Sequence, residues 1–266
     1  MLSKDGIEKF TSKVIPFLHV TTKIPGKKYD DLLLKNHFGG FPTLAFMDAE
    51  GKILTTLHYT KRSIEGFEET LRQVSRLQDL RSRAETDPQA AKDLLFLELD
   101  MKTLRYAAAR ERAKGMDFTK AERLAYETAL VETLSRLGLE KATAEVAKLS
   151  LQPGPKARAQ EILSDLQINK ELRPLMRGYR PGVDPEPPYH LALGLYHRGL
   201  LPSDKPNLNS LYWSGVSRAA FKTKDIQAFE AALKRLRGAF SKSNPQWIQN
   251  LETQLSTLSK EAVKKN

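Results

Sequence analysis

The feature that most restricts the fold of this chain is a change in hydrophobic periodicity near residue 80. Before that position, short apolar runs typical of β-strands alternate with segments of helical periodicity. After it, apolar residues recur at helical spacing and the strand patterns stop. The sequence therefore predicts an α+β fold, in which a mixed region over residues 1–80 precedes helices alone.

The clearest strand pattern of this mixed region is the sequence GGFPTLAFMDAEGKIL. Strands are predicted over residues 44–48 and 52–57, on either side of a turn from Asp48 to Gly51. Aspartate is favoured at the first position of a type I turn, and glycine suits the left-handed residue that closes a hairpin. Pro42, at the mouth of the first strand, is a candidate for a cis peptide bond. The stretch predicts an antiparallel hairpin.

The elements expected around this hairpin follow a definite order. A strand over residues 14–20 and a helix over 28–37 precede it. A helix over 63–77, capped by Ser63, follows it. Together with the Phe-Pro-Thr step at 41–43, this order resembles the C-terminal two-thirds of a thioredoxin-like domain of the bacterial type. The resemblance covers roughly a quarter of the chain.

The resemblance implies a peptide-binding groove beside a cis proline. In thioredoxin-like proteins an extended polypeptide pairs with the backbone at that position, as an added β-strand would. By resemblance, the groove is lined by Gly40, Phe41, Pro42 and Thr43. The alternative is that Pro42 only shapes the fold, since the reactive pair that such a groove normally faces is missing.

The chain contains no cysteine, so the Cys-x-x-Cys motif of the family is absent. A helix expected over residues 3–10 matches the end of the family's redox helix, and the first strand and helix and the central strand have no counterpart. Loss of a central strand would leave two sheet edges unpaired. We therefore hypothesise that the protein starts upstream of Met1, with a cysteine or selenocysteine redox motif in that segment. The upstream reading frame tests this hypothesis.

Two helical regions are predicted, over residues 81–180 and 181–266, with a proline-rich break at 180–188. The first begins with one long helix, capped by Asp87, that runs toward Gly115. Further helices are expected over 119–138, 140–150, 155–168, 188–199, 207–222, 225–240 and 245–262. The later helices resemble tetratricopeptide-type repeats in the spacing of their apolar and aromatic residues. The residue pattern of that family, however, cannot be placed on them in register. A repeat-like helical array without a named repeat is the expectation.

The net charge of +11, from 43 basic and 32 acidic residues, favours acidic partners. The basic residues are spread through the predicted helices, which favours a solvated surface over a binding patch. The two densest basic clusters lie at 105–114 and 173–180. Neither shows the combination of basic and aromatic residues of a named RNA-binding module. A basic helical nucleic-acid-binding protein is the less favoured alternative.

No catalytic residue, metal site or cofactor is predicted. None of the five histidines forms the His-x-x-x-His spacing of a metal site on a helix. Glycine-rich phosphate-binding loops and the GxSxG nucleophile motif are also missing. No run of about 18 apolar residues predicts a membrane-spanning helix, and the chain as written shows no secretory signal.

These observations favour a non-catalytic, thioredoxin-like protein that binds a polypeptide partner. The alternative is a thiol or selenol oxidoreductase whose active-site segment lies upstream of Met1, so the sequence leaves open whether the protein is an enzyme. The compartment is cytoplasmic by default and extracytoplasmic if the protein starts upstream. The oligomeric state is left open.

Overall fold

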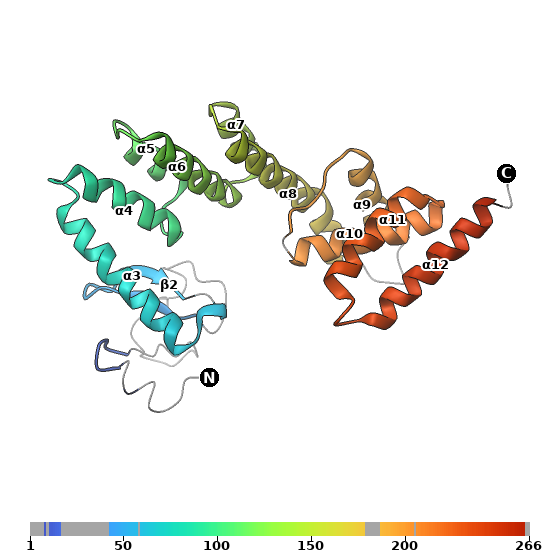
Figure 1. Cartoon of the computed structure of the whole chain (residues 1–266), viewed down its shortest axis with the longest axis horizontal. Helices are drawn as coiled ribbons and strands as arrows, with labels where there is room; N and C mark the ends of the chain where they lie inside the picture. Colours follow the sequence, from blue (N-terminus) through green and yellow to red (C-terminus); the bar gives the residue numbers. More distant parts are fainter. Residues whose placement is uncertain are drawn as a thin grey trace. The chain divides into compact units, whose positions relative to one another are not determined.

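The computed structural model describes residues 8, 11–16, 43–57, 59–178, 187–204 and 206–263. These residues are mostly helical, with one small antiparallel sheet of two strands, in agreement with the broad fold class expected. Contacts group the chain into two compact units, Met1–Thr119 and Lys120–Asn266. They are called here the N-terminal unit and the C-terminal unit, and their elements are labelled in Figure 1.

The sheet of the N-terminal unit is the predicted hairpin. Strands β1 (Ala45–Met47) and β2 (Ile53–Thr56) pair antiparallel. Between them, Gly51 has a φ of 80°, and its N–H donates to the Asp48 carbonyl over 3.1 Å. The Asp48 carboxylate accepts a further bond of 2.7 Å from the Lys52 N–H. The predicted hairpin and its turn are confirmed.

Helix α3 (Ile64–Arg83) follows a short 3₁₀ turn, η1 (Tyr59–Lys61), and packs on the hairpin (Figure 1). The Ser63 hydroxyl accepts a 3.2 Å bond from the Gly66 N–H, which confirms the predicted cap. Gly66 has no room for a side chain, because a Cβ there would stand 2.1 Å from the Lys61 carbonyl oxygen. The core between the hairpin, α3 and the next helix contains Leu54, Val74, Leu77, Leu80, Ala90, Leu94 and Leu97.

The prediction of a single long helix after Asp87 is wrong. The chain forms α4 (Pro88–Asp100), turns, and starts again as α5 (Tyr106–Ala113). Asp87 caps α4 as predicted, and its carboxylate accepts from two backbone N–H groups. At the break Lys102 has a φ of 57°, and the amides of the next two residues donate to the Glu98 carbonyl. A left-handed residue ends a helix, and a lysine in that role leaves no mark in the sequence.

Lys102 offers a direct test of this break. A left-handed backbone costs a non-glycine residue roughly 1–2 kcal/mol, whereas glycine adopts it without that cost. Lys102→Gly should therefore raise the free energy of unfolding, measured by urea titration, by about 0.5–1 kcal/mol. Lys102→Ala removes the same charge but keeps the Cβ, so it should give no gain. Equal stability of the two variants would contradict the assignment.

The first half of the C-terminal unit is built around one long helix, α8. Its elements are α6 (Lys120–Thr133), η2 (Leu134–Arg136), α7 (Leu139–Ala147) and α8 (Pro153–Gly178). Helix α6 starts where predicted but ends before Gly138, which caps α7 instead. Helix α8 runs beyond the predicted end at residue 168, with Pro174 inside it. Burial of Ile168 and Leu172 in the core of the later helices outweighs the backbone bond that the proline removes.

The second half of the C-terminal unit is the helical array that the sequence predicts. Its helices agree with the predicted ranges to within two residues: α9 (Pro187–His197), α10 (Pro206–Thr223), α11 (Ile226–Phe240) and α12 (Pro245–Val263). Each packs on the next, around buried side chains that include Tyr212, Trp213, Phe229, Leu233, Leu236 and Ile248 (Figure 1). Gly215 lets α10 approach α9 closely, since a Cβ there would stand 2.9 Å from the Ala192 Cβ.

Other predicted elements fall wholly or partly outside the described residues. The helix over 28–37 and most of the break at 180–188 lie there. Residues 14–16 of the strand predicted over 14–20 are described and form no strand, and Ile15 is 96% exposed, so that part of the prediction is wrong. The division of the sequence at residues 80 and 180 stays an interpretation. Among the helices described, none is both long and apolar enough to cross a membrane.

Candidate functional site

The groove residues predicted from the thioredoxin-like resemblance fall almost entirely outside the described chain. Gly40, Phe41 and Pro42 lie there, and Thr43 is half-buried two residues before β1. The groove and its cis proline therefore stay predictions.

Two histidines, His190 and His197, lie in the described part of the C-terminal unit. His197 Nε2 lies 2.8 Å from the Asp225 carboxylate, and His190 is exposed. Asp225 also caps α11 by accepting from the Ala228 N–H, so this contact ties α9 to the start of α11. In the described part of the chain, no group of three or more histidine or acidic side chains is placed to hold a metal ion.

The basic cluster at 105–114 is tied into the N-terminal unit. Arg112 pairs with the buried carboxylate of Glu98 on α4. The guanidinium of Arg110 lies 6.0 Å from the ring centre of Tyr106. These contacts favour a structural role for the cluster over the nucleic-acid patch weighed as the alternative.

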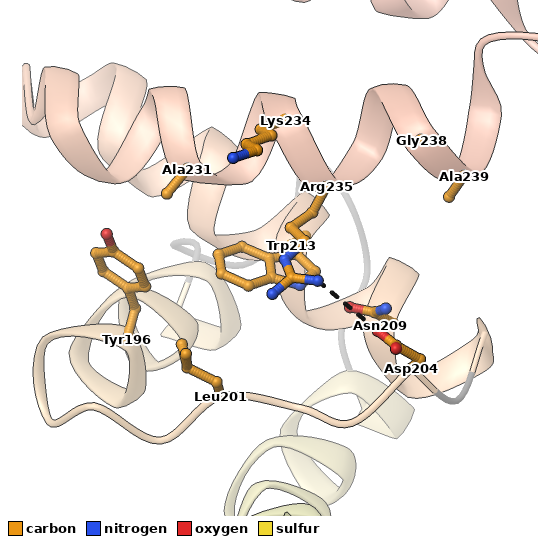
Figure 2. A pocket seen from close by; sticks show the side chains of 10 residues that line it. All are labelled: Tyr196, Leu201, Asp204, Asn209, Trp213, Ala231, Lys234, Arg235, Gly238 and Ala239. Atoms are coloured by element: carbon orange, nitrogen blue, oxygen red, sulfur yellow. Dashed lines mark ion pairs between the residues drawn. The ribbon is translucent and has the colours of Figure 1, made fainter.

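A cleft in the C-terminal unit brings together apolar, cationic and amide side chains. It has a volume of about 720 Å³ and lies between α11 on one side and α9, α10 and their connecting loop on the other (Figure 2). Its lining residues, which define the cleft below, are Tyr196, Leu201, Asp204, Asn209, Trp213, Ala231, Lys234, Arg235, Gly238 and Ala239.

Small residues on one stripe of α11 make room for the cleft. The small residues Ala231, Gly238 and Ala239 share this stripe with Arg235, and a Cβ at Gly238 would meet no atom within 4 Å. At 1.5 Å per residue the stripe is about 12 Å long. A length of this order accommodates three or four residues of an extended polypeptide.

The opposite wall is aromatic. Figure 2 shows Tyr196 and Leu201 on one side of the Trp213 indole, and Asn209 with Asp204 on the other. Trp213 is only 4% exposed and meets the Tyr196 ring edge-on, with 5.9 Å between the ring centres. The wall is therefore rigid, with the indole held inside the fold and its rim at the cleft.

The polar groups of the cleft are incompletely paired. Arg235 Nη1 lies 3.7 Å from a carboxylate oxygen of Asp204, a side chain that is 93% exposed. Lys234, on the same helix, forms no ion pair with any described residue. The Oδ1 atom of Asn209 is buried and accepts no hydrogen bond within the described structure.

The loop between α9 and α10, residues 200–204, is fixed to the helices behind it. Asp165 on α8 is 2% exposed, and its carboxylate accepts from the N–H and the hydroxyl of Ser203 at 2.8 and 2.6 Å. The Tyr212 hydroxyl on α10 donates to the Leu200 carbonyl at 2.6 Å, and burial raises the pKa of that phenol. This wall of the cleft is formed before any ligand arrives.

A second cleft, with a volume of about 550 Å³, lies between the end of α8 and helices α9 to α12. Its lining residues are Met176, Tyr189, Ser210, Leu211, Ser214, Phe240, Asn244 and Trp247. These side chains are neutral, and Phe240 and Trp247 meet edge-on at 5.4 Å. The first cleft has the more selective chemistry, because its lining includes cations and an amide.

Comparisons with protein-family models, curated proteins and solved structures find no match to this chain. The function of the cleft is therefore argued from its own residues. The Trp213 indole lies in the inter-helix core, and the sequence analysis did not predict the cleft at its rim. The exposed small residues Gly238 and Ala239 on an amphipathic helix were the available sign.

Proposed function

We propose that this chain is a non-catalytic polypeptide-binding protein and that the cleft is its binding site. The cleft combines a rigid aromatic wall, a helix stripe of small residues and incompletely paired polar groups. Concave sites of this size, mostly apolar with a few convergent polar groups, are the usual form of ligand sites in proteins. The observation on which the proposal depends most is the concave lining itself, which sets the Trp213 wall opposite the cations of α11.

The chemistry of the lining residues favours binding over catalysis. Asp204 is almost fully exposed and paired with Arg235, an arrangement that does not activate a general acid or base. The lining contains no serine, histidine or threonine that could serve as a nucleophile or its base. The cysteine-free sequence has no thiol for disulfide exchange.

For the N-terminal unit we retain the thioredoxin-like relationship as part of the proposal. It is supported by the confirmed hairpin and by α3, which follows the hairpin as the last helix of that fold does. In this proposal the N-terminal unit is a remnant without redox chemistry, and partner binding belongs to the C-terminal unit.

The test is selection from a random displayed peptide library on the full chain, followed by affinity measurement with labelled peptides. Gly238→Leu should weaken binding of the selected peptides at least about tenfold, because a leucine at this position of α11 would fill part of the cleft. The substitution should not harm the fold, since the Cβ meets no atom and leucine favours a helix more than glycine does.

Gly154→Leu is the matched control for this experiment. Gly154 lies on α8 and is exposed, and a Cβ there would also meet no atom within 4 Å, but the residue does not line the cleft. This variant should bind the selected peptides as the unchanged chain does. The proposal fails if no peptide is enriched, or if enriched peptides bind Gly238→Leu with unchanged affinity.

A further inference from the structure

We propose that the segment recognised by the cleft is an acidic internal stretch of a partner polypeptide. Its glutamate or aspartate carboxylates would pair with Lys234 and Arg235. This inference rests on the proposed function, because it specifies the partner of the same cleft.

The charges of the cleft favour an anionic occupant. Lys234 and Arg235 line it with a single acidic side chain, Asp204. Lys234 has no ion-pair partner among the described residues, so its ammonium is available to a ligand. The net charge of +11 would also speed the approach of an acidic partner.

Asp204 pairs with Arg235, as we expect a carboxylate of the partner to do. Its distance of 3.7 Å from Arg235 and its exposure of 93% describe a weak, solvated ion pair. A carboxylate of the partner would replace it at Arg235, and the two like charges would then repel each other. Removing the charge at Asp204 should therefore strengthen binding, whereas removing the cations should weaken it.

The buried indole argues against single-stranded nucleic acid, the other polyanion that such cations could bind. Bases stack on exposed aromatic faces, and Trp213 is only 4% exposed. An internal segment is favoured over a chain terminus because two neighbouring cations can hold two carboxylates, whereas a terminus supplies one.

The experiment measures fluorescence polarisation of labelled probes on the full chain. The acidic probe is a peptide of about nine residues, capped at both ends, with a central leucine flanked by glutamates, long enough to cross the stripe of about 12 Å when extended. A glutamine counterpart, the same counterpart with a free C-terminal carboxylate, and an oligothymidylate of about ten nucleotides complete the set.

The acidic peptide should bind about tenfold more tightly than its glutamine counterpart, and added salt should reduce the difference. The double variant Lys234→Gln/Arg235→Gln should remove most of this preference. Asp204→Asn should strengthen binding of the acidic peptide about two- to threefold. The glutamine counterpart should bind the unchanged chain and these variants alike.

The outcomes separate the two proposals. If glutamine peptides bind as tightly as acidic ones and Gly238→Leu still blocks binding, the acidic preference is wrong and the polypeptide-binding function stands. If the double variant Lys234→Gln/Arg235→Gln weakens binding of only the free-carboxylate peptide or the oligothymidylate, the proposal that the partner is an internal acidic segment is wrong. If no peptide binding is sensitive to Gly238→Leu, both proposals fall.

Discussion

Replacing Arg81 and Arg112 together by alanine should lower the free energy of unfolding of the N-terminal unit by about 3–5 kcal/mol. The reason is the carboxylate of Glu98, whose side chain is 3% exposed. Arg81 from α3 binds one of its oxygens at 2.8 Å, and Arg112 from α5 binds the other. Without both guanidinium groups a buried negative charge has no cation beside it, and that is among the costliest single defects in a protein.

A third substitution distinguishes this cause from a simple loss of contacts. Adding Glu98→Leu to the double variant removes the buried charge and keeps an apolar side chain of similar size, so most of the lost stability should return. The measurements are urea titration and hydrogen exchange of the amides in α3, α4 and α5. A triple variant no more stable than the double variant would show that the uncompensated charge is not the source of the loss.

Phe229→Ala should destabilise the C-terminal unit by about 3–5 kcal/mol. Phe229 is fully buried on α11, and its ring centre lies 6.1 Å from that of Phe221 on α10. Truncation leaves a cavity in a core made of several helices, which has little freedom to collapse. The midpoint of thermal or urea unfolding, followed by circular dichroism, reports the effect.

Phe240→Ala is the internal comparison for this prediction. Phe240 lies on the same helix but is only partly buried, at the rim of the second cleft. Its truncation should cost clearly less than that of Phe229, because much of the vacated space opens to solvent. A loss at Phe240 as large as that at Phe229 would contradict the assigned core.

Structure that depends on neighbouring residues could be predicted from the sequence. Ser63 and Asp87 cap their helices through amides two or three residues away, so residue type and spacing were sufficient. The Asp48–Gly51 turn is equally local, and it sets the register of the hairpin. The four helices of the array were placed well because each has its own proline, aspartate or glycine boundary.

Structure that depends on tertiary contacts could not be predicted. The break at Lys102 lies between Glu98 on α4 and Arg112 on α5, which form an ion pair although they are 14 residues apart. Helix α8 passes Pro174 because its buried side chains pack on other helices. The basic residues of the helices were expected on a solvated surface, and Lys234 and Arg235 are exposed. Hydrophobic periodicity does not reveal that the loop between α9 and α10 lies opposite them.

The two hydrogen bonds between Asp165 and Ser203 affect the entropy of partner binding. Ordering a flexible loop on binding takes free energy away from the affinity, and a loop already held in place avoids that loss. The 200–204 segment is held from behind by a carboxylate on α8 that does not line the cleft. The affinity of the cleft should therefore depend on a residue that never contacts the partner, so substitutions at Asp165 can weaken binding by loosening a wall while leaving every contact residue unchanged.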